Sequence, residues 1–145
     1  METKAKTKTI GIKVKSPQES CADKKCPFHG NLKVRGQSFV GTVIAADVHR
    51  SATVEWNRRL FIPKYERYEK RRSKVRVHNP SCIAAKEGEL VKIHECRPLS
   101  KTKHFVIVEK TGQDVLFAQK QELREEAKIQ ETKKEAANRK AEVEE

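Results

Sequence analysis

The stretch from Gly88 to Lys103, which reads GELVKIHECRPLSKTK, decides the fold. It begins as a strand, because the apolar side chains of Val91 and Ile93 fall at alternate positions, and it runs into a loop interrupted by a proline. That loop carries cations and hydroxyl groups, namely Arg97, Ser100, Lys101, Thr102 and Lys103. Rigid scaffolds commonly present binding loops in this way, and such side chains donate hydrogen bonds to phosphate oxygens. The stretch therefore predicts a core strand that leads into a polyanion-binding loop.

Three segments resemble a known family. The segment ECRPLSKTK at 95–103, followed by the apolar run at 105–108, is similar to the signature of the seventeenth protein of the small ribosomal subunit. The segments DKKCPF at 23–28 and PKYERYEKRR at 63–72 resemble its longer archaeal and eukaryotic branch, so the resemblance covers about residues 10–110. It implies an all-β, five-stranded Greek-key barrel of the OB type that binds the 5′ part of the small-subunit rRNA and helps it fold during assembly. Neighbouring small-subunit ribosomal proteins are further implied partners, in the cytoplasmic ribosome.

The charge of the chain points to the same class of partner. The whole sequence carries 32 Lys and Arg against 20 Asp and Glu, a formal net charge of +12 with a pI near 9.7. Residues 1–110 hold 25 basic and 11 acidic side chains, whereas residues 111–145 hold 7 and 9. A basic front domain attracts nucleic acid or an anionic membrane, although a merely soluble cationic protein is the plain alternative.

A membrane partner has less support in the sequence. There is no apolar run of about 18 residues, no signal with a charged head and an apolar core, and no basic amphipathic helix with bulky anchors. We therefore expect a cytosolic protein without a membrane partner.

The central part of the chain reads as strands only. Apolar and β-branched side chains mark 38–46, 53–62, Val75 with Val77, 90–94 and 105–108, and no helical pattern intervenes. Five short strands favour a small barrel over a parallel sheet with crossovers. An SH3-like barrel would fit this count as well without the resemblance. With it, we predict an OB-type barrel at 31–110, an extended basic N-terminal segment at 1–30 and a charged helical tail at 111–145.

The two terminal segments carry little apolar surface. Met1 to Ser20 is rich in Lys and Thr, and Ile10, Ile12 and Val14 alternate as in a short strand, which we expect to lie along a surface rather than in a core. The tail favours a solvated helix, with Glu131–Lys134 and Glu135–Arg139 at pairing distance but no sustained heptads.

The densest charge lies in the connection after the second predicted strand. Tyr65 and Tyr68 sit there, and each could stack on an unpaired base or hydrogen-bond a 2′-hydroxyl, or instead pack on the barrel. Its dense cations predict contacts with successive phosphates, and Arg71 and Arg72 are the strongest candidates. The cations of this segment are Arg58, Arg59, Lys64, Arg67, Lys70, Arg71, Arg72, Lys74 and Arg76.

Other candidates lie outside this segment. Arg35, and Arg50 at a predicted turn between strands, are secondary candidates for RNA contact. Trp56 fits a core position better than a stacking platform.

The cysteines raise a rival site. Four residues separate Cys21 from Cys26, with His29 close behind, and such spacing is typical of structural zinc sites. A second close pair is missing, since thirteen residues separate Cys82 from Cys96. A Cys21–Cys26 disulfide is disfavoured in a reducing cytosol. The sequence therefore favours reduced cysteines without a metal or other cofactor, with zinc and a disulfide as the alternatives.

Enzymatic chemistry has no support in the sequence. The five histidines are scattered without a nucleophile or a carboxylate partner, there is no phosphate-binding glycine loop, and no small-molecule substrate is indicated. The alternative to an rRNA-bound structural protein is a free OB-type binder of single strands. That reading needs several exposed aromatics on the barrel, whereas most aromatics here occupy core-like strand positions.

Overall fold

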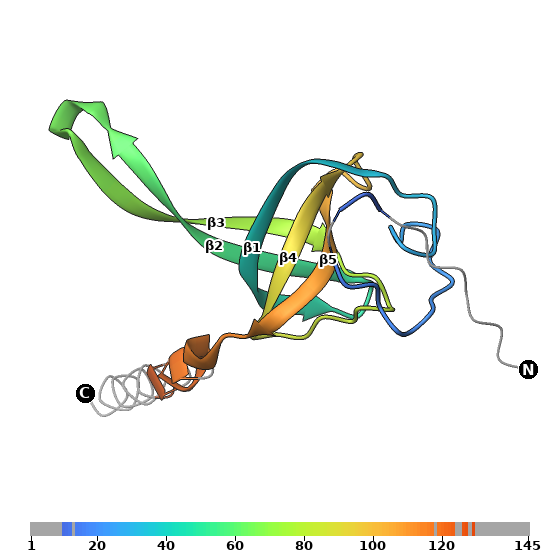
Figure 1. Cartoon of the computed structure of the whole chain (residues 1–145). Helices are drawn as coiled ribbons and strands as arrows, with labels where there is room; N and C mark the ends of the chain where they lie inside the picture. The colour runs from blue at the N-terminus through green and yellow to red at the C-terminus, as the bar shows by residue number, and fades with distance from the viewer. Residues whose placement is uncertain (1–9, 13, 118, 124–125, 128, 130–145) are drawn as a thin grey trace, which may run out of the picture. The chain divides into compact units, whose positions relative to one another are not determined.

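The computed structural model describes residues 10–12, 14–117, 119–123, 126–127 and 129 (Figure 1). Its elements are β1 (Val34–Asp47), β2 (Ser51–Ile62), the short 3-10 helix η1 (Pro63–Tyr65), β3 (Arg67–His78), β4 (Glu89–Cys96) and β5 (Lys103–Gln113). All five predicted strands are present, and each is longer than the sequence pattern indicated.

The strands close into a barrel in the order β1-β2-β3-β5-β4, with β4 returning to β1. The pairs β1–β2, β2–β3, β4–β5 and β1–β4 are antiparallel, and β3–β5 is parallel. This closed five-stranded arrangement with one parallel contact confirms the predicted OB-type Greek-key barrel.

The interior of the barrel is filled by small and branched aliphatic side chains. Val91 and Ile93 of β4 are both fully buried, which confirms the alternation in the sequence. Trp56 packs against this core and stacks on Phe39, with ring centroids 4.7 Å apart, and Phe39 contacts Phe105 at 6.0 Å. The interior side chains, which form the barrel core, are Val43, Ala52, Val54, Val77, Ala85, Val91, Ile93 and Ile107.

A second core lies on the outer face of β5. Ile107 belongs to the barrel core, whereas its neighbours Val106 and Val108 point to the opposite side of the strand, as the period of two requires. The N-terminal segment covers them, and Figure 1 shows this blue segment beside β5. The outer core consists of Cys26, Phe28, Leu32, Cys82, Cys96, Val106 and Val108.

The expectation for the N-terminal segment needs correction. Ile10 and Val14 pack against the outer core rather than lying along a surface, and the described residues 10–12 and 14–20 form no strand. Residues 1–9 and 13 lie outside the described part of the chain. The segment packs here because β5 exposes two valines on its outer face, and burying them removes apolar surface from water.

The segment between the predicted strand at 53–62 and Val75, which we expected to be a connection, instead supplies the turn and most of the second strand of a long hairpin. β2 and β3 pair continuously from Ser51 with His78 to Ile62 with Arg67. The contact of β1 with β2 ends at Glu55, and that of β5 with β3 begins at Arg76. Residues 56–73 therefore have only each other as sheet partners. Figure 1 shows them projecting from the barrel, and we call them the arm.

A second compact unit starts at Asp114. Its described residues 115–117, 119–123, 126–127 and 129 are helical, as predicted for the tail. The pairs Glu131–Lys134 and Glu135–Arg139 lie outside the described residues. In the part of the chain that the structure describes, no helix has the length and apolarity needed to cross a membrane.

Candidate nucleic-acid interface

The register of the arm places cations directly opposite one another. Arg58 pairs with Arg71, and Arg59 pairs with Lys70. Because successive side chains of a strand point to opposite faces, each face of the arm carries one of these pairs. Like charges at directly opposed positions destabilise a hairpin, so the arm carries repulsion that a bound anion would relieve.

The cations of the hairpin fall into two groups. Arg71 binds Glu69 at 2.8 Å, Arg72 and Lys74 share Glu55 at 3.5 Å each, and Arg76 pairs with Asp47. The second group is exposed and has no carboxylate partner among the residues that the structure describes; it consists of Arg58, Arg59, Lys64, Arg67 and Lys70. The two strongest candidates from the sequence, Arg71 and Arg72, are thus partly neutralised, and the free cations lie beside them.

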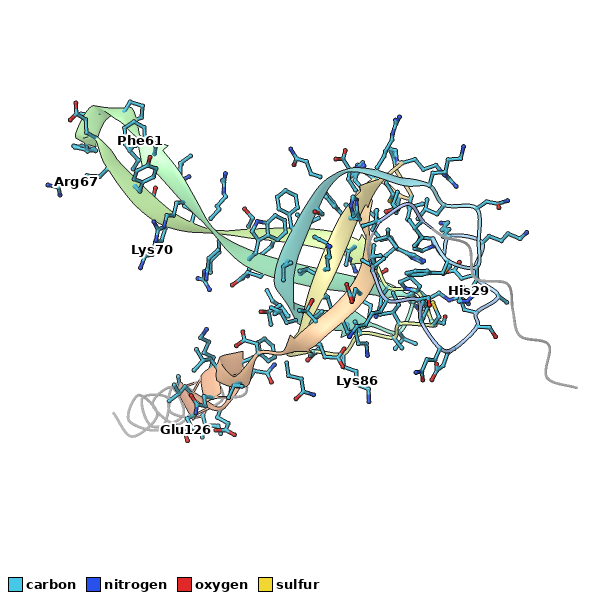
Figure 2. The ribbon with its side chains drawn as sticks, in the orientation of Figure 1. His29, Phe61, Arg67, Lys70, Lys86 and Glu126 are labelled. Atoms are coloured by element: carbon cyan, nitrogen blue, oxygen red, sulfur yellow. The ribbon has the colours of Figure 1, made fainter. Side chains whose placement is uncertain are left out.

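Aromatic side chains gather at the tip of the arm. Phe61 and Tyr68 face each other with ring centroids 5.2 Å apart, and Lys64 Nζ lies 5.3 Å from the ring centroid of Tyr65. Phe61, Tyr65 and Tyr68 are 46%, 62% and 69% exposed, so the alternative that the tyrosines pack on the barrel is wrong. Figure 2 shows Phe61, Arg67 and Lys70 together on the arm.

A surface hollow also forms at this tip. It is lined by Ile62, Tyr65, Arg67, Tyr68 and Glu69. Two tyrosine rings beside a guanidinium that has no carboxylate partner among the described residues can receive a flat, anionic or hydrogen-bonding group, such as an unstacked nucleotide. Sequence reasoning missed Phe61 as a site residue, because its position opposite Tyr68 becomes visible only once the hairpin register is known.

The loop after β4 holds only part of its predicted set toward solvent. Arg97, Ser100, Lys101 and Thr102 are exposed, and Lys103 is half-buried. The Ser100 hydroxyl also accepts the Lys103 backbone N–H at 3.1 Å. Lys103 is the first residue of β5, and its ammonium donates to the Ser51 hydroxyl at 2.8 Å.

This loop adjoins the base of the arm. Arg76 of β3 lies opposite Lys103 of β5 in the parallel register. The predicted contact residues of the arm and of the loop therefore belong to neighbouring parts of one sheet.

The secondary candidates lie at other places. Arg35 is exposed on β1. Arg50 lies in the β1–β2 turn with φ of 53°, and its guanidinium is 3.4 Å from the Asp23 carboxylate. His78 Nε2 is 2.7 Å from the other Asp23 oxygen. Burial raises the pKa of Asp23, but the Lys25 backbone N–H, His78 and Arg50 together hold it below its usual value.

The cysteines are arranged differently from the sequence expectation. The sequence offers no second close pair of cysteines, but the structure brings His29 and Cys82 beside Cys21 and Cys26. Cys96 lies apart, and its thiol donates to the His104 carbonyl. All four cysteines are free thiols. The hydrogen bond between Cys26 and Cys82 shifts the two thiol pKa values in opposite directions. The Cys82 thiol donates to the Cys26 thiolate, which lowers the pKa of Cys26, and the need to keep that proton raises the pKa of Cys82.

Comparisons with known proteins agree on one family. The family model described as "Ribosomal protein S17" matches residues 41–109. A protein of Methanocaldococcus jannaschii named "Small ribosomal subunit protein uS17" is 54% identical over 72% of this chain and 90% of its own length. A protein of the same name from Methanosphaera stadtmanae is 55% identical over 69% of this chain and 94% of its own length. Another, from Archaeoglobus fulgidus, is 50% identical over 72% of this chain and 94% of its own length.

Proposed function

The chain belongs to the ribosomal protein S17 family, and we propose on this premise that it is a structural constituent of the small ribosomal subunit in the cytoplasm, binding small-subunit rRNA through the arm and the loop after β4. The family is a class of structural rather than catalytic proteins. This assignment accounts for a basic barrel that holds its most concentrated charge on a projecting hairpin.

The single observation that carries the proposal is the pair of opposed cations on each face of the arm. Arg58 faces Arg71, and Arg59 faces Lys70; among the described residues, a carboxylate compensates only Arg71 of these four cations. Folded RNA presents closely spaced phosphates, and neutralising them releases counterions. An arm inserted between RNA segments can bind phosphates with both faces, which converts internal repulsion into affinity.

The tip supplies a different kind of contact. Tyr65 and Tyr68 line the hollow beside Arg67, so an unpaired base can stack there while its phosphate meets the guanidinium. We propose that arm and loop hold separate parts of the 5′ region of the rRNA, and that this bridging favours the folded RNA during assembly. Neighbouring ribosomal proteins are the second proposed class of partner.

A free single-strand binder is the second candidate function. The exposed aromatics at the tip favour it. The barrel aromatics do not, because Phe39, Trp56 and Phe105 contact one another beside the core instead of forming an open platform. Comparing binding to a folded 5′-domain rRNA fragment with binding to an unstructured strand of equal length separates the two functions.

The test removes the four unpaired cations that lie on the two strands of the arm. A variant with Arg58, Arg59, Arg67 and Lys70 all changed to Gln should bind the folded fragment more weakly, with a salt dependence reduced by about three units of slope at roughly 0.7 to 0.9 per lost contact. A matched control changes four exposed lysines elsewhere, Lys15, Lys33, Lys86 and Lys120, to Gln and so removes the same charge. Equal losses in both variants, or a preference for the unstructured strand, would refute this function.

A further inference from the structure

Four soft metal ligands converge on the side of the barrel away from the arm. Cys21, Cys26 and His29 come from the N-terminal segment, and Cys82 comes from the connection between β3 and β4. One ligand atom from each lies within 4.8 Å of the other three. Figure 2 shows His29 at the opposite side of the barrel from Phe61 and Arg67, so this cluster is separate from the proposed RNA interface.

Three distances within the cluster are close to the edges of a zinc tetrahedron, and the remaining pairs of ligand atoms lie within 4.8 Å. Zn–S bonds of about 2.3 Å and Zn–N bonds of about 2.0–2.1 Å require S···S edges of about 3.8 Å and S···N edges of about 3.6 Å. The Cys26 and Cys82 sulfurs are 3.6 Å apart, and His29 Nδ1 lies 3.4 Å from Cys21 Sγ and 3.6 Å from Cys26 Sγ. A disulfide would need sulfurs at about 2.05 Å, far closer than the Cys26–Cys82 pair.

A tight turn fixes two of the ligands. Within it, the Gly30 N–H donates to the Cys26 carbonyl at 2.9 Å, and the Asn31 N–H donates to the Lys24 carbonyl at 3.2 Å. A Cβ at Gly30 would lie 2.4 Å from the Lys24 carbonyl oxygen, so the turn admits only glycine. The backbone N–H groups of Phe28 and His29 donate to the Cys26 sulfur. Such donors are the outer-shell partners that orient a thiolate ligand.

Cys82 is fixed by its own loop. Asn79 donates to the Ala85 carbonyl at 2.9 Å and accepts the Ala85 N–H at 3.0 Å. Within the loop that these two hydrogen bonds close, the N–H groups of Ile83 and Ala84 donate to the Pro80 carbonyl at 3.0 and 2.9 Å.

The two segments that carry the ligands are also joined to each other. The buried contact between Asp23 and His78, at 2.7 Å, links the N-terminal segment to the end of β3 just before the Cys82 loop. Two independently braced segments therefore present the four ligands without help from an ion. Preorganisation of this kind favours metal affinity, since little conformational freedom is left to lose on binding.

We propose that Cys21, Cys26, His29 and Cys82 form a structural zinc site that ties the N-terminal segment to the β3–β4 connection. A closed set of three cysteines and one histidine is a structural zinc donor set, and it leaves no position for a substrate. Cys26 and Cys82 are the inner ligands, at 0% and 8% exposure. Cys21 and His29 are half-buried and line a surface hollow, through which an ion can enter.

The site has a clear structural role. Cys26 and Cys82 both belong to the outer core, where the N-terminal segment covers β5. Zinc would cross-link that cover to the barrel in a reducing compartment where a disulfide does not persist. Each cysteine that binds gives up its thiol proton to solvent, so affinity rises with pH.

The experiment measures zinc in the full chain. Untagged protein purified under reducing conditions should contain one zinc per chain by elemental mass spectrometry. Cys21→Ser and His29→Ala should lose it, whereas the matched controls Cys96→Ser and His104→Ala should keep it, because these side chains lie outside the cluster. Chelation of the wild type should lower its melting temperature and leave that of Cys21→Ser unchanged.

Cobalt substitution covers the case in which a variant folds poorly. Apo wild-type protein refilled with cobalt should show the strong absorption of a tetrahedral thiolate complex, and Cys96→Ser should show the same spectrum. Zinc at the level of the buffer blank in folded wild-type protein, octahedral cobalt, or equal zinc in all four variants would each overturn the site. A Cys26–Cys82 disulfide in protein purified under reducing conditions would also overturn it.

Discussion

The arm and the outer core differ in what holds them together. The arm buries little, exposes three aromatics and sets cations opposite cations. The outer core buries apolar side chains and thiols on the outer face of β5 and is braced by hydrogen bonds within its loops. One region gains its stability from within the chain, while the other carries repulsion that a ligand can relieve. Because the barrel separates the two regions, we expect substitutions in the arm to alter rRNA binding and substitutions in the outer core to alter stability.

The largest effect should come from removing the arm. Trp56 and Ser73 lie directly opposite each other, so residues 57–72 can be replaced by an Asn-Gly turn of the type that closes two-residue hairpins. The shortened protein should fold as before. Its salt slope for rRNA should fall by about five units, since seven cations are lost at roughly 0.7 to 0.9 each. Binding within a factor of two of wild type would show that the arm is not the interface.

A matched pair of phenylalanine variants sharpens the comparison. Phe28→Ala, in the outer core, should cost about 3–5 kcal/mol of unfolding free energy and leave the rRNA affinity of the folded fraction unchanged. Phe61→Ala, at the exposed tip, should change stability by under about 1 kcal/mol.

Binding should follow the opposite pattern. Phe61→Ala should weaken rRNA binding by about 1–3 kcal/mol if a base stacks there. Denaturant unfolding and filter binding on both proteins check this pair. Similar changes in both properties for both variants would remove the distinction between the regions.

A single charge change on the arm should move stability and binding in opposite directions. Arg59→Gln removes the repulsion with Lys70 and should raise the unfolding free energy by about 0.2–1 kcal/mol. The same change should weaken rRNA binding. Arg71→Gln is the control, because Arg71 is already paired with Glu69 and its loss should give no gain in stability. A destabilised Arg59→Gln protein would show that the opposed cations are not under strain.

The smallest effect concerns the buried His94. Burial first, and then nearby Lys92, lower its pKa below the usual 6.5, although Glu95 acts in the opposite sense. The unfolded chain therefore binds a proton more readily than the folded one, so stability is lost as the pH falls below about 6.5. His94→Gln should flatten the melting temperature between pH 7 and 5 relative to wild type. Parallel curves for the two proteins would assign the pH dependence elsewhere.

The sequence predicted the strands of the barrel because one physical rule governs them. A strand that buries one face carries apolar side chains at alternate positions, as at Val91 and Ile93, and a strand that buries both faces carries a continuous apolar run, as at 105–108. The structure buries Val91, Ile93 and residues 106–108 of that run. The first strand of the arm belongs to the predicted strand at 53–62, whereas its second strand escaped prediction. Residues 67–74 read RYEKRRSK, so no alternation of apolar and polar side chains marks a strand there, and the segment reads as a charged connection.

The grouping of side chains within sites was less predictable. Cys82 meets Cys26 across 56 positions of sequence, a contact that only the closure of the barrel and the packing of the N-terminal segment create. Lys103 appeared to belong to the loop with Arg97 and Lys101, but it begins β5 and bonds Ser51. In each case residue type and local spacing were visible, whereas the partner was set by tertiary structure.

The central claim is that the arm contacts rRNA, and crosslinking from the arm tip tests it most directly. A photoreactive amino acid at Phe61, incorporated into assembled small subunits, should crosslink to rRNA at one or a few nucleotides. Tyr65 provides a second tip position with the same expectation, since it lines the hollow beside Arg67. Crosslinks from both positions to ribosomal proteins alone, with no attached rRNA, would contradict the account.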